Sequence, residues 1–166
     1  MREKWIVETK KGDFNGLSAK LKVSPLAVRC LMNRGVESEQ GMREFLYGTL
    51  DDLHDPFLMK GMDEAVREIV KAKEQGRKVA IASDFDCDGI FSAYILWKGF
   101  QRIGLDSEIF TPDRVKEGYG LNRRIVDEAL AGGRDFLVTC DNGIAANEEV
   151  DYAKKLGMTV IVTDHH

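Results

Sequence analysis

The first part of the chain carries apolar residues at the spacing of helices. From about residue 16 to residue 73 they recur three and four positions apart, as at Val66, Ile69 and Val70, which places them on one face of a helix. The Ser24-Pro25 pair predicts a helix start, and Gly35 predicts a helix end. We therefore expect three or four helices here, with a loop over residues 51–58.

The second part alternates short apolar runs with helical stretches. Four runs predict strands, at residues 78–82, 107–110, 135–139 and 159–162. Three stretches predict helices, at residues 89–103, 122–131 and 146–156. Repeated strand-helix-strand order is typical of a parallel sheet with right-handed crossovers. The predicted fold class is α/β, a parallel sheet with helices on both faces over residues 75–166, preceded by a small helical N-terminal region over residues 1–74.

Composition is that of an ordinary globular protein. Hydrophobic residues make up 43% and charged residues 31% of the 166 positions, and no apolar run approaches the roughly 20 residues that span a bilayer. Residues 1–5 lack the apolar core of a secretory signal. Three cysteines without C-x-x-C spacing argue against a disulfide framework and against a thiolate zinc site. We expect a cytoplasmic protein with no membrane partner.

Charge is distributed unevenly along the chain. The net charge of −4 gives no overall electrostatic footprint for nucleic acid. Basic residues outnumber acidic ones in the first fifty positions, and the remainder of the chain is acidic. Acidic surfaces are usually only solvated, but carboxylates gathered in one place are also what divalent cations neutralise. The positions of the carboxylates decide between these interpretations.

Polar side chains leave the carboxyl ends of the predicted strands, where open α/β sheets bind ligands. They are Asp84, Asp86 and Asp88 after the first strand, Asp141 after the third, and Asp164, His165 and His166 after the fourth. Asp86 and Asp88 are two residues apart, so in an extended segment both carboxylates point the same way. Together with Asp141 and an imidazole, they offer oxygen and nitrogen ligands. This mixture suits Mn²⁺ or Mg²⁺, with Zn²⁺ or Fe²⁺ as further options.

A simpler interpretation exists for each of these residues taken alone. Aspartates after strands often cap the following helix, as Asp88 before Gly89 or Asp141 before Asn142 could. Their coincidence at consecutive strand ends favours a metal site. Cys87 and Cys140 flank the proposed ligands, and strand alternation predicts both as small buried residues.

The stretch after the second strand predicts a phosphate contact. Arg114 and Lys116 precede Tyr119, between glycines such as Gly118 that let a backbone approach a ligand closely. Arginine forms bidentate contacts with phosphate, and tyrosine offers a face for stacking. A solvated surface loop explains this stretch equally well by itself. Its place next to a metal edge favours phosphate.

Four of these stretches resemble the first motifs of the DHH phosphoesterases. They are Asp84-Phe85-Asp86-Cys87-Asp88-Gly89-Ile90, Asp113-Arg114 with Glu117-Gly118-Tyr119-Gly120-Leu121, Thr139-Cys140-Asp141-Asn142-Gly143-Ile144, and Asp164-His165-His166. Within this family the chain is most similar to the 5′→3′ exonucleases specific for single-stranded DNA, from about residue 21 to residue 166. Phe85 and Cys87 depart from the family's usual residues, but neither departure removes a ligand.

The resemblance implies a role for each strand-end residue. A two-metal site of Mn²⁺ or Mg²⁺ would be held by Asp86, Asp88, Asp141 and His165. Catalysis would depend on Asp141, His165 and His166, with Asp84 and Asp164 as supporting carboxylates that orient the ligands. The terminal phosphate and the first base of the substrate would be bound by Arg114, Gly118 and Tyr119.

The activity implied by the resemblance is hydrolysis of phosphodiester bonds in single-stranded DNA, in DNA repair and recombination, with repair or replication proteins as further partners. In the family, another aspartate ligand and a C-terminal domain follow the histidine pair, so residues 1–166 are expected to be an inactive part of a longer enzyme. Two alternatives are a DHH phosphodiesterase acting on oligonucleotides or cyclic dinucleotides, and a non-catalytic DHH-like scaffold that binds DNA or a partner protein. The intact acidic and histidine residues argue against the scaffold.

Overall fold

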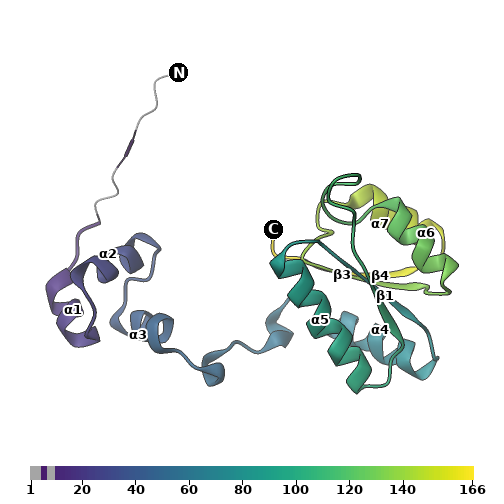
Figure 1. Cartoon of the computed structure of the whole chain (residues 1–166). Helices are drawn as coiled ribbons and strands as arrows, with labels where there is room; N and C mark the ends of the chain where they lie inside the picture. The colour runs from purple at the N-terminus through teal and green to yellow at the C-terminus, as the bar shows by residue number, and fades with distance from the viewer. Residues whose placement is uncertain (1–4, 7–9) are drawn as a thin grey trace. The chain divides into compact units, whose positions relative to one another are not determined.

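The chain divides into two compact units, Met1–Leu58 and Met59–His166. The computed structural model describes residues 5–6 and 10–166 (Figure 1). Residues 1–4 lie outside the described residues. They belong to the N-terminal segment in which the sequence shows no apolar core of a secretory signal.

The first unit, within residues 10–58, is helical. Its α-helices are α1 (Phe14–Leu21), α2 (Pro25–Asn33) and α3 (Glu39–Tyr47). Each begins at a side chain that accepts a hydrogen bond from a backbone N–H of the first turn, namely Asp13, Ser24 and Ser38. The predicted start at Ser24-Pro25 is therefore confirmed. The helices enclose a small core of Leu21, Val28, Leu31, Met32 and Met42.

The predicted loop over residues 51–58 contains two single helical turns. These are the 3₁₀ helices η1 (Leu50–Asp52) and η2 (Pro56–Leu58). Thr49 and Asp52 stabilise η1 by a capping box. The Asp52 carboxylate accepts a hydrogen bond from the backbone N–H of Thr49, and the Thr49 hydroxyl accepts one from a backbone N–H of the turn. Such short turns carry no apolar periodicity, so the sequence pattern does not indicate them.

The second unit is built on a four-stranded parallel sheet. Its strands are β1 (Val79–Ser83), β2 (Ser107–Phe110), β3 (Phe136–Cys140) and β4 (Thr159–Thr163), in the spatial order β2-β1-β3-β4. Every neighbouring pair is parallel. The predicted strands are confirmed to within a residue, and their carboxyl ends lie along one edge of the sheet.

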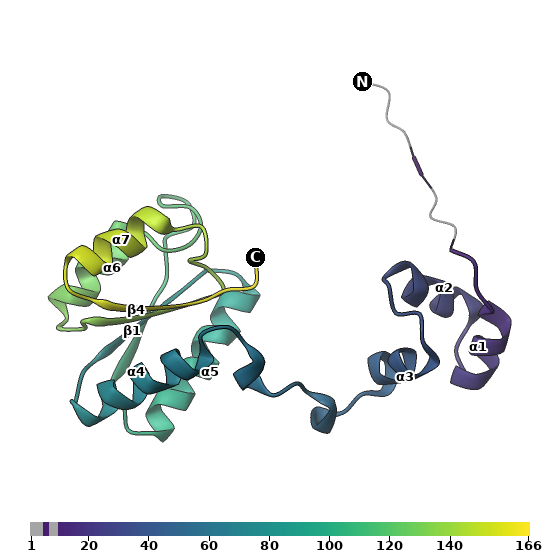
Figure 2. The ribbon, with the colours of Figure 1, turned by 180° about the vertical axis from the view of Figure 1, so that it is seen from behind.

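Helices cover both faces of this sheet (Figures 1 and 2). One face carries α4 (Met62–Glu74) and α5 (Cys87–Arg102), whose Ala72, Ala93 and Phe100 pack with Val79, Ile81 and Phe136. The other face carries α6 (Arg123–Ala131) and α7 (Asn147–Lys155), whose Ile125, Ala129 and Ala153 pack with Ala80 and Leu137. Successive strand residues thus alternate between two cores. The predicted α/β class is confirmed.

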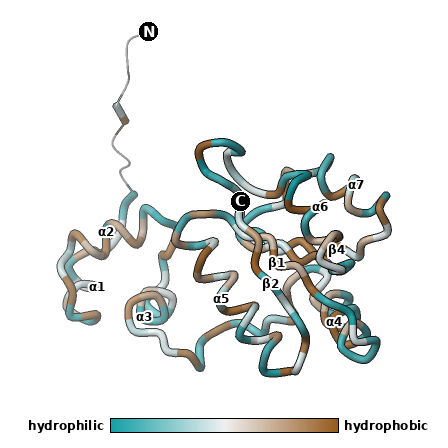
Figure 3. The backbone as a smooth tube through the Cα atoms, turned by 45° about the vertical axis from the view of Figure 1, so that its right-hand side comes forward, coloured by the Kyte–Doolittle hydropathy of each residue, from teal (hydrophilic) through white to brown (hydrophobic). Residues whose placement is uncertain are grey.

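Apolar residues gather in the strands at the centre of the second unit, as the brown segments of Figure 3 show. Every residue of β1 and β3 is buried, whereas β4 is half-buried along its length. This is the pattern expected of inner and edge strands in a sheet covered on both faces. None of the described helices combines the length and the apolar character needed to cross a bilayer.

Helix α4 belongs to the sheet unit. Its Ala72 is completely buried in the core that includes β1 and α5, and Ile69 packs against the same core. The sequence prediction placed the boundary after residue 74, because α4 continues the helical periodicity of the preceding segment. Periodicity reports that a helix has an apolar face, but it does not report which core receives that face. By its contacts the chain divides after Leu58, and the domain boundary after residue 74 stays a prediction.

Arg77 connects the beginnings of three strands. Its guanidinium donates to the Asp135 carboxylate (Nε to Oδ1, 3.0 Å), to the Asp135 carbonyl (3.0 Å) and to Thr159 Oγ1 (3.1 Å). It also lies 5.1 Å from the centre of the Phe136 ring. A single cation, 18% exposed, therefore ties the segment before β1 to the starts of β3 and β4.

Replacing Arg77 by alanine is expected to lower the free energy of unfolding by about 1.5 kcal/mol, because hydrogen bonds to a sheltered charge are lost. Urea denaturation followed by circular dichroism measures the change. Arg67→Ala is the matched control, since its ion pair with Glu64 is exposed and should contribute less than about 0.5 kcal/mol. Equal effects for the two variants would show that Arg77 contributes no more than a surface ion pair.

Candidate metal centre

Three aspartates lie side by side at the carboxyl edge of the sheet. Ser83, Cys140 and Thr163 are register partners at the ends of β1, β3 and β4. The residues that follow them are Asp84, Asp141 and Asp164, so the parallel register alone brings these aspartates together. All are sheltered: Asp84 is 1% exposed, and the side chains of Asp141 and Asp164 are 3% and 4% exposed. The edge has the acidic character that the sequence predicts.

Asp141 is held in an uncommon backbone conformation. Its φ is 61°, in the left-handed region that aspartate and asparagine tolerate better than most residues. Its N–H donates to the Thr163 carbonyl (3.1 Å), and its own carbonyl accepts from the Tyr119 hydroxyl (2.6 Å). The carboxylate Oδ1 lies 2.7 Å from Nε2 of His165. The capping alternative fails for Asp141, because the cap position of α7 is Ala146.

Asp164 anchors the two histidines. Its carboxylate accepts from the backbone N–H groups of Ile144 (2.9 Å), His165 (2.7 Å) and His166 (3.2 Å), and it lies 2.7 Å from Nδ1 of His166. Burial alone would raise the pKa of Asp164, but these hydrogen bonds hold the pKa at about 2. The Asp164 carboxylate in turn raises the pKa of His166. Metal-binding histidines are commonly oriented in this way: a carboxylate binds one ring nitrogen, and the other nitrogen is available to the metal.

The residues present fit a divalent cation. Asp141, His165 and His166 each offer one ligand atom, and these atoms lie within 4.8 Å of one another. Carboxylate oxygen and imidazole nitrogen without thiolate suit Mn²⁺ or Mg²⁺. In addition, Oδ2 of Asp84 is buried without a hydrogen-bond partner, and its Oδ1 accepts only a 3.3 Å bond from the N–H of Gly120. A buried carboxylate with so little compensation favours a nearby positive charge.

Asp86 and Asp88 do not lie in an extended segment. Asp86 caps α5, since its Oδ1 accepts from the N–H of Gly89 at 3.1 Å, which is the role that the sequence analysis considered for Asp88. Asp88 is exposed in the first turn of α5. Residues two apart at a helix start do not share a face as they do in a strand. Neither belongs to the group of converging ligand atoms, so their assignment as metal ligands stays a prediction.

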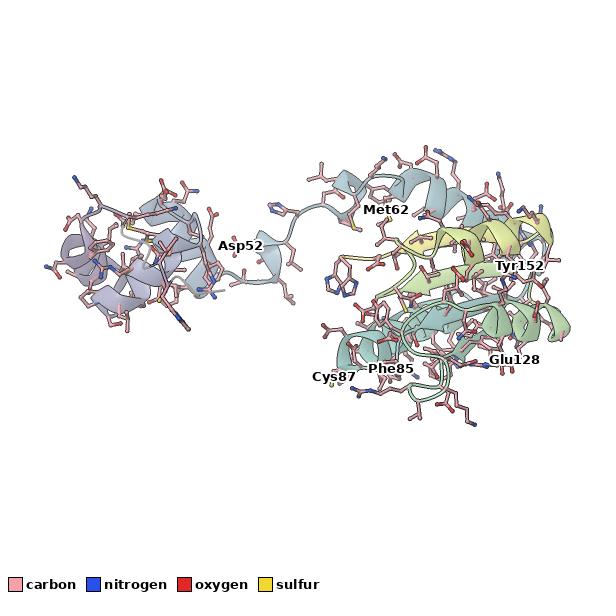
Figure 4. The ribbon with its side chains drawn as sticks, turned by 90° about the horizontal axis from the view of Figure 1, so that it is seen from above. Asp52, Met62, Phe85, Cys87, Glu128 and Tyr152 are labelled. Atoms are coloured by element: carbon pink, nitrogen blue, oxygen red, sulfur yellow. The ribbon has the colours of Figure 1, made fainter. Side chains whose placement is uncertain are left out.

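The buried position predicted for Cys87 is wrong. Cys87 is the first residue of α5 and is exposed, and Figure 4 labels it close to Phe85 at that end of the helix. Strand alternation predicts burial only if the strand continues, and β1 ends at Ser83. Cys140 is buried as predicted, and burial raises the pKa of its thiol to about 12, so it is unreactive.

Tyr119 reaches the cluster from the loop after β2. Besides donating to the Asp141 carbonyl, its hydroxyl lies 3.3 Å from Nδ1 of His166. Burial, followed by the charges of Asp164 and Asp141, raises the pKa of Tyr119. The residue is nevertheless 54% exposed. Gly118 precedes it with a φ of 80°, a conformation that favours glycine.

Arg114 of the same loop lies beside the end of β1. Its guanidinium is 5.0 Å from the centre of the Phe85 ring, which follows β1. Within this loop, Tyr119 therefore lies at the ends of β3 and β4, and Arg114 lies at the end of β1. Both positions adjoin the acidic edge, and the phosphate contact stays a prediction.

Comparison with known proteins identifies the family. Residues 78–166 match the model described as DHH family, N-terminal domain. The chain belongs to the DHH family. The single-stranded-DNA-specific exonuclease RecJ of Bacillus subtilis (strain 168) is 37% identical over 164 residues, which are 98% of this chain and 21% of the relative. RecJ of Escherichia coli (strain K12) is 35% identical over 86% of this chain and 24% of the relative.

Solved structures of DHH proteins agree with this assignment. A crystal structure of exonuclease RecJ bound to manganese matches with a TM-score of 0.60 and 37% identity, over 65% of this chain and 28% of that one. RecJ of Thermus thermophilus in complex with Mn²⁺ matches with a TM-score of 0.64 and 29% identity, over 92% of this chain and 21% of that one. The chain spans about a fifth of the length of the first curated relative it matches.

Two residues of the DHH motifs support the cluster in ways that the sequence analysis missed. Asn142 is completely buried, and its Nδ2 donates to the carbonyls of Ala82 (3.1 Å) and Cys140 (2.9 Å), which ties the ends of β1 and β3 together. Gly89 lies so close to the exit of β1 that a Cβ there would be 2.5 Å from the carbonyl oxygen of Asp84. Both residues stand in the quoted motifs, but their roles depend on contacts between segments that one sequence does not reveal.

A cavity of about 400 Å³ adjoins His166. Its lining includes Tyr119, Leu121, Asn122, Ile144 and His166. The carboxylates of Glu117, Glu149 and Asp164 also line it, so the cavity is partly apolar and partly acidic.

Proposed function

We propose that this chain carries the metal-binding part of an exonuclease that degrades single-stranded DNA in the 5′→3′ direction during DNA repair and recombination. The observation that carries the proposal is the meeting of Asp141, His165 and His166 at one sheet edge, beside a loop that presents an arginine and a tyrosine. The RecJ names of the relatives supply the substrate class. The cytoplasmic location predicted from the sequence is part of the same proposal.

Asp141 and His165 would be the central metal ligands, with His166 close enough to contact either metal or the scissile phosphate. Asp84 and Asp164 would orient these ligands, since Asp164 already binds the backbone of both histidines. Asp86 and Asp88 would join as ligands from the start of α5. When bound, a pair of Mn²⁺ or Mg²⁺ ions would activate a water and neutralise charge on the phosphoryl oxygens.

Arg114 and Tyr119 would hold the end of the DNA strand. Arg114 lies against the Phe85 ring, which does not neutralise its charge, and a guanidinium placed in this way could form a bidentate contact with a phosphate. Tyr119 has its hydroxyl engaged at Asp141 and its ring half exposed, which is suitable for stacking on a base. Gly118 would let the backbone come close to the same nucleotide.

The activity of the whole enzyme is part of the proposal, because the chain covers 21% of the B. subtilis relative. Residues 1–166 alone are expected to bind metal and the end of a strand weakly and to be nearly inactive on DNA. The test is a chimera in which this chain replaces the matching segment of the B. subtilis relative. With Mn²⁺ it should release mononucleotides from single-stranded DNA, starting at the 5′ end, and leave a blunt duplex intact.

Other outcomes of this assay would identify the alternatives. Faster hydrolysis of cyclic dinucleotides or very short oligonucleotides than of long single strands would favour a DHH phosphodiesterase of a different kind. DNA binding by a folded chimera without any Mn²⁺-dependent hydrolysis would favour a non-catalytic scaffold.

A further inference from the structure

The loop between β2 and α6 is folded onto itself. Oδ1 of Asp113 accepts from the N–H groups of Val115 (3.0 Å) and Lys116 (3.2 Å). The Asp113 carbonyl accepts from the N–H of Glu117 (2.8 Å), and the Glu117 carboxylate accepts from the N–H of Asp113 (2.7 Å). Arg114 thus stands at the tip of a closed turn whose base is formed by Asp113 and Glu117.

Arg124, in the first turn of α6, binds the base of this turn. Its Nη2 donates to the Glu117 carboxylate (2.7 Å) and to the carbonyl of Thr111 (3.1 Å), its Nε donates to the same carboxylate, and its Nη1 donates to Glu128 (2.7 Å). One guanidinium therefore contacts both the start of the loop and the base of the turn. Helix α6 itself packs in the sheet core through Ile125, Val126 and Ala129, so the guanidinium is carried by a fixed element.

The positive charge of Arg124 is neutralised within this arrangement. Arg124 faces two carboxylates, and the side chain of Glu117 is only 20% exposed. Arg124 holds the pKa of Glu117 at about 2, so the pair stays ionised at every ordinary pH. A guanidinium whose donors are engaged by the protein is a poor ligand for an incoming phosphate. Its effect on a substrate must pass through the loop.

We propose that the Arg124–Glu117 pair is a positioning clamp that fixes the loop carrying Arg114 and Tyr119 before the 5′-terminal nucleotide binds. The inference rests on the proposed function, which assigns these two residues to the terminal phosphate and base. A loop fixed in advance loses less conformational entropy on binding, so the clamp raises affinity without touching the ligand. Arg124 and Glu117 are positioning residues in this scheme.

The direction in which Glu117→Gln changes DNA affinity distinguishes a clamp from a direct effect of charge. Arg124→Ala removes a positive charge, and Glu117→Gln removes a negative one. If these charges acted directly on DNA, Arg124→Ala would weaken binding and Glu117→Gln would strengthen it. If they act through the clamp, both variants weaken binding, and the double variant is no worse than either single one.

The test measures two properties of residues 1–166. Hydrogen exchange of the peptide covering residues 111–121, without DNA or metal, reports the order of the loop. Anisotropy of a 5′-phosphorylated, fluorescent oligothymidylate in Mn²⁺ reports its affinity. Both single variants are expected to exchange faster and to bind about three- to tenfold more weakly, while Mn²⁺ affinity stays unchanged. Arg123→Ala is the matched control, because Arg123 stacks on Tyr152 away from the loop.

The results distinguish a wrong clamp from a wrong function. Tighter binding by Glu117→Gln, or unchanged exchange in both variants, would overturn the clamp. If Arg114→Ala weakens binding while the clamp variants exchange faster and bind normally, the proposed function stands and the positioning role is wrong. If Arg114→Ala also binds normally, the loop does not hold DNA, and the clamp is overturned together with the phosphate assignment.

Discussion

Asp141→Asn is expected to weaken Mn²⁺ binding by residues 1–166 at least about 100-fold, the upper end of what the loss of a residue that merely supports a ligand costs. Asparagine keeps the shape of the side chain and tolerates the left-handed backbone of Asp141, with its φ of 61°. The backbone bonds to Thr163 and Tyr119 can therefore persist. What is lost is the negative charge opposite His165. Titration calorimetry at neutral pH measures the affinity.

The matched control is Asp127→Asn on α6. Its carboxylate accepts from the Tyr152 hydroxyl (2.8 Å) on the surface formed by α6 and α7, so Mn²⁺ affinity should not change. Equal affinities for the wild type and Asp141→Asn would rule out Asp141 as a ligand. The double variant Asp86→Ala/Asp88→Ala decides the open assignment at the start of α5. A fall in affinity would support these residues as ligands, and an unchanged affinity would show that Asp86 only caps the helix.

The acidic sheet edge could be predicted because strand ends and register follow from simple patterns. Apolar runs of strand length locate Ser83, Cys140 and Thr163 to within a residue, and repeated strand-helix-strand order makes the strands parallel. Once the strands are parallel, whatever follows them meets at one edge. No knowledge of side-chain contacts is needed to place Asp84, Asp141 and Asp164 together.

The local path of the chain beyond each strand could not be predicted in the same way. The sequence prediction treated residues 84–88 as extended, whereas the chain turns into α5 at Asp86, because this side chain caps the helix. The outcome depends on whether the chain continues the strand or starts a helix, and an N-cap side chain favours the helix by about 1 kcal/mol. The exposure of Cys87 and the cap role of Asp86 both follow from this one turn.

Contacts between segments that are distant in the sequence could not be predicted either. The role of Asn142 is evident only when β1 and β3 are known to be neighbours. The role of Arg124 is evident only when α6 is known to pack beside the loop. Arg124 follows Arg123 in the sequence, and the sequence alone does not indicate that the two arginines have different partners. In the structure one binds the loop, and the other stacks on Tyr152. Local patterns determine which elements form, and packing determines which polar residues become partners.

Arg114→Ala is expected to weaken binding of the chimera to 5′-phosphorylated single-stranded DNA by about 2 kcal/mol, roughly 30-fold in Kd, because a charge-assisted contact with the terminal phosphate is lost. The Kd for the same strand with a 5′-hydroxyl should change little. The slope of log K against log salt should become shallower by about 0.7 for one lost phosphate contact. Fluorescence anisotropy over a salt series measures all three quantities.

Arg114→Lys sharpens this prediction, because it keeps the charge and removes the planar guanidinium that lies against Phe85. If the contact is bidentate and held by stacking, lysine should restore the salt slope but only part of the preference for a 5′-phosphate. Arg123→Ala should behave as the wild type, since its guanidinium is occupied at Tyr152. An unchanged salt slope and an unchanged 5′-phosphate preference in Arg114→Ala would mean that this stretch is an ordinary surface loop, and that the terminal phosphate is bound elsewhere.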